Sequence, residues 1–590
     1  MNKLLFQLGL LTCLLGQKLI TIDRYEITAN EISEHIRFLS SDRLKGRYPG
    51  TPGSKTALHY IEKNWKKVGI LPGGDWGFKQ TFIFSDDISI SGYNRVKINE
   101  TKKSFRIGRD FNPLGFSGVG QYDGPVVFCG YGFNVTDSLS WDDYRSVDVS
   151  GKWALVFRGG PDGRDQDSQY SDYIPLRKKY LAARDHGAVG ILFVNRFNDE
   201  NQDDLIPLTF SRSSGGEKIA ALHLSQSLSE LLLPAGVSLN DLQTKLDKNK
   251  ASVSMLTPNS LSVKIGLKEK KIKGVNLVGN IPGDGSTDEV LVIGAHRDHL
   301  GYGGENSGSL SPYEYAIHNG ADDNASGIAG LLELAEKFAA RSESLKRGLL
   351  FVAFDGEEKG LLGSKYFVEH PTAKMENIVT MINMDMVGRL KETTLSVGGT
   401  GTSPGFEIML DSLQLKHGLK LSYNQGGYGP SDHSSFYTKK TPVLFFFTGA
   451  HEDYHKPSDD WEKINADGEK QILDLIYDVI TVLSNEKEKP PFTSAGSKEP
   501  PSSRRKFKVT FGIIPSYTGS GPGFAIDGVR PDGPADRAGL ISGDTVVEIG
   551  GKKVEDIYDY MYRLGELKKG ETVEVKVRRG EEILILLIDL

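Results

Sequence analysis

The chain has 590 residues, of which 38% are hydrophobic and 25% charged, and its formal net charge at pH 7 is -6. This balance is typical of a globular protein, and the small negative charge, without any basic block interleaved with aromatics, argues against a nucleic-acid partner. With about 100–200 residues per domain, the length predicts roughly three or four domains.

The N-terminus predicts export. Residues 1–18 are typical of a signal peptide, because one lysine precedes an apolar stretch over residues 4–15 that is too short to span a bilayer. A frayed helix is the alternative. We expect a periplasmic or extracellular protein without a transmembrane segment in the mature chain. Cys13 is a candidate for lipid attachment, but Thr12 before it makes a poor lipobox. Cys129, in the run VVFCGYG, is expected to be a buried, inert thiol.

Three segments follow along the chain. Residues 28–110 predict two helices, separated by the turn sequence RYPGTPGS, and then short strands. Residues 111–265 contain the strand-like runs GPVVFCGYG, KWALVFRGG and AVGILFVN but no cluster of ligand-type side chains, so they indicate an inserted module with its own core. Residues 266–488 contain the continuous apolar runs VLVIGA, GLLFVAF, IVTMINM and VLFFF, which are typical of buried parallel strands between helices.

The C-terminal part predicts a separate small unit. Residues 489–507 are polar and rich in proline and serine, which is typical of a linker. Residues 508–590 alternate short strand-like runs with two helical segments. We therefore expect a β-rich domain there.

Five residues with metal-binding side chains lie just past or beside apolar runs, in the order His296, Asp323, Glu358, Asp385 and His455. Two imidazoles and three carboxylates suit zinc or a similar divalent ion, and one carboxylate can bridge two ions. In open α/β sheets, ligands bind at the carboxyl ends of the strands, so we expect these residues to meet at one edge. Each residue alone has an ordinary explanation, such as a helix cap for Asp323, but their joint order favours a metal site.

The stretches GAHRDHLG, NGADDNASG, FDGEEKGLLGS, INMDMVGR, SDHSSFY and DYHKPSDDWEKIN resemble the co-catalytic di-zinc aminopeptidase family, which also contains glutamate carboxypeptidase and the transferrin receptor. The resemblance covers residues 28–110 and 266–488. Residues 120–265 resemble a protease-associated (PA) domain, and residues 508–590 resemble a PDZ domain. The resemblance implies an α/β fold: a mostly parallel zinc-peptidase sheet flanked by helices, an inserted PA-like β/α domain and a C-terminal PDZ-like β-rich domain.

This resemblance implies two zinc ions per chain. His296 and Asp385 would bind one ion, Glu358 and His455 would bind the other, and Asp323 would bridge both. None of these five positions departs from the family pattern. The complete set argues against a receptor-type scaffold that has lost its ligands.

The resemblance also implies three catalytic roles. Asp298 would orient the imidazole of His296, and Glu357 would be the general base. Tyr454 would donate a hydrogen bond to the oxyanion, or would simply pack as an aromatic residue. For His299 and His433, lining of the pocket and packing both stay open.

The implied function is a secreted zinc-dependent aminopeptidase that hydrolyses N-terminal residues from peptides with a free N-terminus. The alternatives are a carboxypeptidase or dipeptidase of the glutamate carboxypeptidase type and a non-catalytic receptor-type scaffold. Asp459 is expected to cap the helical region that follows it.

The two accessory domains have open roles. The PDZ-like unit is expected to bind a peptide C-terminus beside residues 511–513, with Ile557, Tyr560 and Met561 on the flanking helix, or to pack on the catalytic domain. The PA-like unit would cover the active-site mouth, restrict substrate size, help assembly or serve as a structural insertion.

Overall fold

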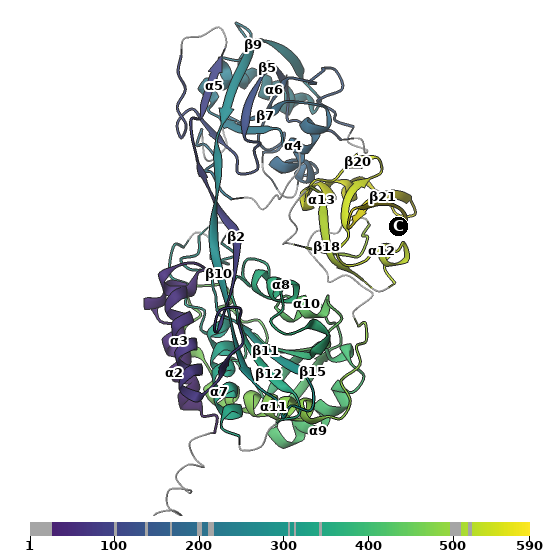
Figure 1. Cartoon of the computed structure of the whole chain (residues 1–590). Helices are drawn as coiled ribbons and strands as arrows, with labels where there is room; N and C mark the ends of the chain where they lie inside the picture. The colour runs from purple at the N-terminus through teal and green to yellow at the C-terminus, as the bar shows by residue number, and fades with distance from the viewer. Residues whose placement is uncertain are drawn as a thin grey trace, which may run out of the picture. The chain divides into compact units, whose positions relative to one another are not determined.

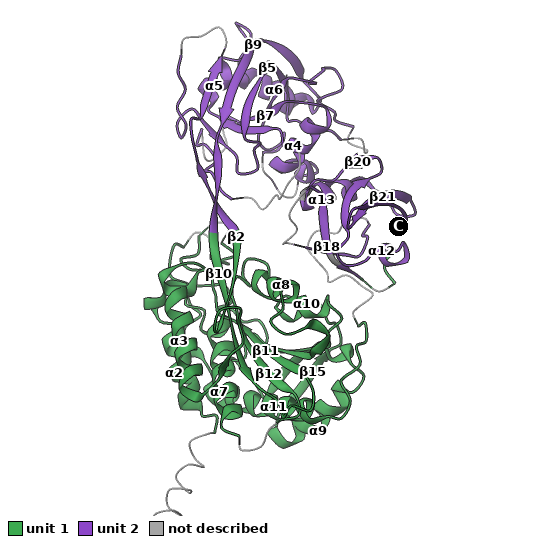
Figure 2. Ribbon diagram, in the orientation of Figure 1, with its two compact units in different colours: residues 1–84, 272–503, 530–533 green, residues 85–271, 504–529, 534–590 purple. Residues whose placement is uncertain are grey.

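The computed structural model describes residues 26–590 apart from 99–102, 136–139, 164, 166–167, 198–202, 211–217, 305–306, 312–313, 342–344, 496–508, 517–521 and 531. The predicted signal peptide, with Cys13, and most of the predicted linker lie outside the described residues. Among the residues described, no helix is both long and apolar enough to cross a membrane. The chain divides into two compact units, which are residues 1–84, 272–503 and 530–533, and residues 85–271, 504–529 and 534–590 (Figure 2).

The first unit is built on a nine-stranded sheet with a parallel centre (Figure 1). Four neighbouring strands form that centre, in the order β12 (Gly348–Phe354), β11 (Val290–His296), β13 (Ile378–Met384) and β16 (Val443–Phe447). They are the four apolar runs predicted as parallel strands, and almost all of their residues are buried. The other strands are β1 (Leu71–Pro72), β2 (Lys79–Ile90), β10 (Leu267–Ile281), β14 (Thr394–Gly398) and β15 (Lys420–Asn424).

Helices cover both faces of this sheet, because alternate residues of a strand point to opposite sides. On β11, Leu291 and Ile293 belong to one core and Val292 to the other. The first core is shared with α2 (Ala29–Leu39), α3 (Pro52–Val68), α7 (Gly327–Ala339), α9 (Phe406–His417) and α11 (Ala466–Asn485). The second is shared with α8 (Leu362–Glu369) and α10 (His433–Tyr437). The predicted α/β class is confirmed.

Local signals set both ends of α3. Thr51 caps α3 by accepting a hydrogen bond from the main-chain N–H of Ser54, and Pro52 occupies the first turn. Gly69, with φ at 85°, closes α3 in the left-handed region. Between α2 and α3 lies the short helix η2 (Asp42–Arg47), whose last residue is the first of the predicted turn sequence at 47–54, and the last three residues of that sequence begin α3.

The second unit contains a seven-stranded sheet with the order β3-β9-β5-β6-β7-β8-β4. Its parallel centre is β5 (Gly120–Cys129), β6 (Trp153–Phe157), β7 (Gly190–Val194) and β8 (Ala220–Leu224). Cys129 is fully buried, and burial raises the pKa of its thiol, as expected of an inert cysteine. The remaining elements are β3 (Arg95–Ile98), β4 (Phe111–Pro113), β9 (Ser254–Ile265), α4 (Leu176–Asp185), α5 (Gln226–Glu230) and α6 (Leu239–Asn249).

The C-terminal sheet of this unit follows the order β17-β18-β19-β21-β22. Tyr560 is 8% exposed, and its ring stacks on Phe524 at 4.4 Å and meets the edge of Phe511 at 5.8 Å. Tyr560 is therefore a core residue, whereas Ile557 and Met561 are only partly buried. The elements are β17 (Ile513–Pro515), β18 (Phe524–Val529), α12 (Pro534–Arg537), β19 (Thr545–Ile549), β20 (Lys552–Lys553), α13 (Ile557–Glu566), β21 (Thr572–Arg579) and β22 (Glu582–Asp589).

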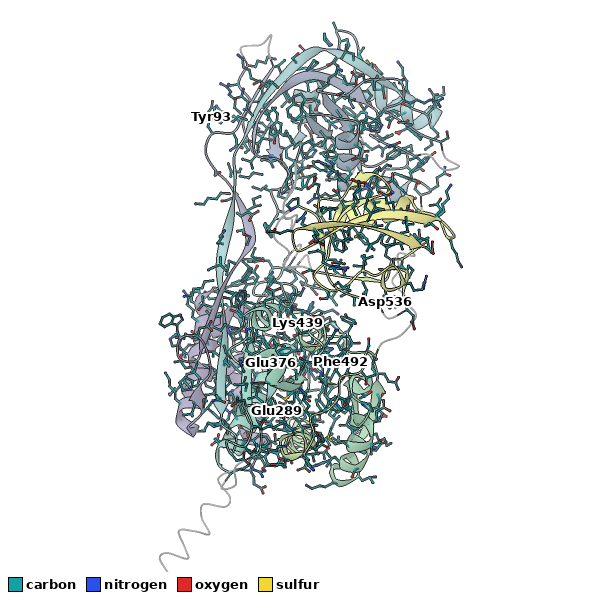
Figure 3. All side chains as sticks on the ribbon, turned by 45° about the vertical axis from the view of Figure 1, so that its right-hand side comes forward. Tyr93, Glu289, Glu376, Lys439, Phe492 and Asp536 are labelled. Carbon is teal, nitrogen blue, oxygen red and sulfur yellow. The ribbon has the colours of Figure 1, made fainter. Side chains whose placement is uncertain are left out.

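The first part of the predicted linker packs on the first unit. Phe492, labelled in Figure 3, places its ring 5.4 Å from that of Tyr437. The hydroxyl of Tyr437 donates to the carbonyl of Ala495 and accepts from its N–H, both at 2.8 Å. The described part of the predicted linker therefore packs on the sheet domain.

Candidate metal centre

The five predicted ligands lie at the carboxyl ends of neighbouring strands. His296 is the last residue of β11, and Asp385 directly follows β13. Glu358 follows β12, and His455 lies in the loop after β16. Asp323 lies in the irregular turn η4 (Ala321–Ser326), immediately before α7. Since β11 lies between β12 and β13, the fold brings these side chains to one edge of the sheet.

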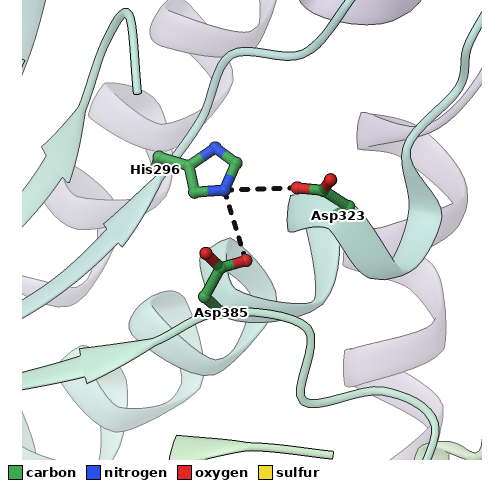
Figure 4. Close-up of side chains that lie close together, drawn as sticks. All are labelled: His296, Asp323 and Asp385. Atoms are coloured by element: carbon green, nitrogen blue, oxygen red, sulfur yellow. Dashed lines mark hydrogen bonds and ion pairs between the residues drawn. The ribbon is translucent and has the colours of Figure 1, made fainter. Parts of the chain in front are cut away.

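His296, Asp323 and Asp385 form the first ligand group (Figure 4). Nε2 of His296 lies 3.2 Å from Oδ1 of Asp323 and 3.3 Å from Oδ1 of Asp385. Two ligands that are each about 2.0–2.2 Å from one zinc ion lie roughly 3.3–3.6 Å apart at a tetrahedral angle. The observed separations are close to that range, so a divalent ion fits between these atoms.

His455, Asp323 and Glu358 form the second group. Nε2 of His455 lies 3.3 Å from Oδ2 of Asp323 and 3.2 Å from Oε2 of Glu358. The two carboxylate oxygens of Asp323 therefore face different groups, which is the geometry of a bridging ligand. Buried carboxylates this close together require cationic partners, so the donor set fits two zinc-like ions.

Carboxylates control the protonation of both imidazoles. Burial alone would lower the pKa of His455, but its hydrogen bonds to Asp323 and Glu358 outweigh burial and raise the pKa to about 11. For His296, the charges of Asp385 and Glu357 likewise overcome burial and raise the pKa well above 6.5. Both imidazoles are therefore in the doubly protonated, charged form at neutral pH in the metal-free protein. An incoming ion must displace one proton from each.

We expect zinc binding to release protons and to weaken as pH falls from about 8 to about 6, because a metal competes with protons for both imidazoles. Isothermal titration in buffers of different ionisation enthalpy measures the number of protons released, and competition with a chelator measures the affinity. An affinity that does not change with pH, with no proton release, would contradict the assignment of His296 and His455 as ligands.

Main-chain carbonyls orient the two imidazoles. Nδ1 of His296 lies 3.2 Å from the carbonyl oxygen of Asp298, and Nδ1 of His455 lies 2.9 Å from that of Gly308. An N–H donated from Nδ1 leaves the lone pair of Nε2 free for a metal. The carboxylate of Asp298 is 3.9 Å from His296 and instead accepts the main-chain N–H of Glu357 at 3.1 Å. Asp298 thus touches His296 through its carbonyl and supports the turn that carries Glu357.

Glu357 and Tyr454 lie beside these ligands. Oε2 of Glu357 is 3.9 Å from Nε2 of His296. Burial, together with the charges of Glu358 and Asp385, overcomes the effect of His296 and raises the pKa of Glu357 well above 4.5. The ring of Tyr454 stacks on that of His455, with centroids 3.9 Å apart, and burial raises the pKa of its hydroxyl. The carboxyl of Glu357 can thus hold a proton, and the hydroxyl of Tyr454 stays protonated.

Arg47 connects two of the ligand-bearing loops, and the sequence did not single it out. Its side chain is buried and donates hydrogen bonds of 2.7, 2.6, 2.9 and 3.0 Å to the main-chain carbonyls of Leu39, Asn319, Gly320 and Arg297. Arg297 directly follows His296, and Gly320 directly precedes the turn that bears Asp323. Burial, opposed by nearby carboxylates, lowers the pKa of Arg47 to about 10, so it remains charged at neutral pH.

Asp459 supports the same turn, and its predicted role as a helix cap was wrong. Its Oδ2 accepts the main-chain N–H groups of Asp322, at 2.9 Å, and Asp323, at 3.1 Å. Its Oδ1 accepts from Arg389 at 3.1 Å. The short helix that follows, η7 (Trp461–Lys463), begins after Asp460 without a side-chain cap, and the next helix, α11, is capped by Asn465. The side chain of Asp459 faces the metal centre because the turn at Asp323 offers two free N–H donors.

The stretch SDHSSFY divides into two environments. His433 stacks on Phe445, with ring centroids 4.3 Å apart, and burial lowers its pKa to about 3, so His433 is a neutral packing residue. Asp432 is also buried, and burial raises its pKa to about 7 although the charge of His296 opposes the rise. Asp432 is therefore a titratable group close to the first ligand group.

Known proteins resemble this chain in three segments. Residues 276–480 match peptidase family M28, residues 122–232 match the PA domain, and residues 506–590 match the PDZ domain. These matches fall on the segments in which the sequence predicted such domains.

Individual relatives match parts of the chain. Aminopeptidase YwaD of Bacillus subtilis (strain 168) is 26% identical over 371 residues, which are 60% of this chain and 67% of that protein. Leupeptin-inactivating enzyme 1 of Streptomyces exfoliatus is 30% identical over 193 residues, which are 31% of this chain and 37% of that protein. Among solved structures, the aminopeptidase from Aneurinibacillus sp. strain AM-1 aligns with 81% of this chain and 98% of its own, with a TM-score of 0.47 and 21% identity.

Proposed function

We propose that this chain is a di-zinc aminopeptidase that removes residues one at a time from peptides with a free N-terminus. The proposal is supported by its match to peptidase family M28, beside PA and PDZ domains. The observation that carries the proposal is the orientation of the Asp323 carboxylate. One of its oxygens faces the group around His296, and the other faces the group around His455. The catalytic domain comprises residues 28–110 and 266–488 in this proposal, with the PA domain at 111–265.

Each ion has its own ligand set in this proposal. His296, Asp323 and Asp385 would hold one zinc, and Asp323, Glu358 and His455 would hold the other. When bound, two such ions supply the Lewis acidity that lowers the pKa of a water molecule toward about 7 and polarises a carbonyl. The chain's own task is to fix the ligands, which the carbonyls of Asp298 and Gly308 do by fixing the imidazole tautomers.

Glu357 moves the proton. It accepts a proton from the attacking water and passes it to the leaving amine, and its raised pKa supports this role because a stronger base holds the proton between the two steps. The hydroxyl of Tyr454, which stays protonated, donates to the oxygen on which negative charge develops.

The negative charge of the site favours binding of a substrate by its N-terminus rather than by its C-terminus. The centre is lined by carboxylates, which suit a positively charged α-amine. A carboxypeptidase of the glutamate carboxypeptidase type needs a cation that is free to bind the substrate carboxylate. Arg47 is committed to main-chain carbonyls and Arg389 to Asp453 and Asp459, so these two arginines near the ligand loops do not offer that anchor.

The proposal predicts chelator-sensitive cleavage of aminoacyl anilides, with activity restored by added zinc. We expect the same anilides with an acetylated amine to be inert, because the free α-amine is part of the recognition. Release of the chromogenic amine measures both substrates, and a panel of side chains ranks the preference. Cleavage of blocked peptides from a free C-terminus would instead favour the carboxypeptidase alternative, and two bound ions without any hydrolysis would favour the scaffold.

The remaining parts have supporting roles in this proposal. Residues 1–18 direct export, and a lipid anchor at Cys13 is the less favoured route. The PDZ domain binds a peptide C-terminus by strand addition beside Phe511 and Ile513, flanked by the partly exposed side chains of α13. Binding of C-terminally free peptides, but not of amidated ones, tests this role by fluorescence anisotropy.

A further inference from the structure

His299 lies beside the second ligand group, and neither the sequence nor the comparisons assign it a role. The side chain is 0% exposed, and its Nδ1 lies 2.6 Å from Oε1 of Glu358. The same atom is 3.9 Å from Oδ2 of Asp323, and the ring meets that of His455 edge-on at 5.9 Å. His299 thus contacts one metal ligand directly and borders two others.

The distances distinguish a metal ligand from a hydrogen-bond donor. The ligand atoms of both groups are separated by 3.2–3.3 Å, close to the roughly 3.3–3.6 Å expected of atoms that share a tetrahedral zinc. The His299 contact is much shorter, at 2.6 Å, near the short end of charge-assisted hydrogen bonds to carboxylates. His299 therefore donates to Glu358 and does not share an ion with it.

The two oxygens of Glu358 have different partners. Oε1 accepts from His299, whereas Oε2 faces Nε2 of His455. We propose that His299 is a positioning residue of the second metal site, whose Nδ1–H holds Oε1 of Glu358 so that Oε2 alone binds the ion. This inference rests on the proposed di-zinc function and deepens it.

The proton on Nδ1 follows from the surroundings of the ring. Among the described residues, Nε2 of His299 has no hydrogen-bond partner, whereas Nδ1 has a carboxylate acceptor. A neutral imidazole has a single N–H, and it therefore lies on Nδ1. Gly320, with φ at 58°, makes room for the ring, because a Cβ there would lie 2.5 Å from Cδ2 of His299. The same Cβ would lie 2.1 Å from the carbonyl oxygen of Asp323, so Gly320 leaves room both for the turn at Asp323 and for this histidine.

Direct ligation by His299 in place of His455 is the competing arrangement. His455 directs Nε2 at oxygens of both Asp323 and Glu358, and its Nδ1 is fixed by the carbonyl of Gly308. His299 reaches only Glu358 at short range. The geometry therefore favours His455 as the ligand and His299 as the residue that orients the carboxylate.

The test counts ions and ligands in full-length variants. His299→Leu removes the donor, and His299→Asn restores an N–H close to the position of Nδ1. We expect His299→Leu to weaken binding of the second zinc by about 10–100-fold, as for other groups that orient a ligand, yet to bind two ions at saturation. His299→Asn should recover most of that affinity. His455→Leu, the comparison variant, should bind one ion only.

Zinc titration against a chromophoric chelator gives the affinities, and X-ray absorption counts imidazole ligands independently of activity. An unchanged second affinity in His299→Leu would overturn the proposal, because His299 would then only pack. Loss of one imidazole ligand, or saturation at one ion, would overturn it in favour of direct ligation. A wild-type chain that binds a single ion would overturn both this inference and the di-zinc function, whereas two bound ions with no hydrolysis would overturn the function alone.

Discussion

Glu357→Gln is expected to lower kcat by about 10²–10⁴-fold while both metal ions stay bound. Glutamine keeps the size of the side chain but cannot accept a proton. The oxygen of Glu357 nearest to His296 is 3.9 Å away, farther than any of the paired ligand atoms at 3.2–3.3 Å, so its loss does not remove a ligand. The effect therefore falls on proton transfer and not on metal content.

The measurement is a kcat for an aminoacyl anilide together with zinc content determined on the same sample. Glu452→Gln, an exposed residue in the loop that carries His455, removes the same charge away from the reacting atoms and should leave kcat within about twofold. If zinc is lost along with activity, Glu357 is a ligand. If kcat is unchanged, the base lies elsewhere, and Asp432, whose pKa is raised to about 7, is the next group to replace.

The candidate ligand set could be proposed from the sequence because its residues follow local patterns. His296 and Asp385 each stand at the end of a continuous apolar run, and such a run predicts a buried parallel strand whose carboxyl end forms a site. Asp323 stands before a helix with an obvious apolar face. Strand order then brings these ends together, so pattern and topology suffice to propose the centre.

The roles of Arg47, Asp459 and His299 could not be predicted from the sequence, because these residues act through contacts between distant parts of the chain. Arg47 bonds to the carbonyl of Asn319, 272 positions away in sequence, and no local pattern marks an arginine that solvates carbonyls. Asp459 looked like a cap because aspartate before a helix usually is one, and only the folded chain places it against the turn at Asp323. For His299, the residue type allowed either a pocket role or a packing role. The 2.6 Å contact with Glu358 favours a role in the site over simple packing.

Arg47→Met is expected to lower the free energy of unfolding of the metal-free catalytic unit by about 3–5 kcal/mol. Methionine keeps an apolar stem of similar length, but five main-chain carbonyls lose a donor, one of them held only at 3.5 Å. Each buried group left unpaired costs about 1–3 kcal/mol before the structure relaxes. Arg43→Met is the matched control, because Arg43 lies in the same short helix η2 and is exposed.

Urea unfolding in the presence of a chelator gives the stability, and hydrogen exchange of β11 and α7 reports on the catalytic unit separately from the rest of the chain. Equal effects of Arg43→Met and Arg47→Met would contradict the role of Arg47. Added zinc separates two contributions of Arg47 to stability, which are its positive charge and its hydrogen bonds. The ions can replace its positive charge beside the carboxylates of Asp298, Asp323 and Glu358, but they cannot replace its hydrogen bonds. We therefore expect zinc to narrow the difference between Arg47→Met and wild type without abolishing it, because only the electrostatic part is restored.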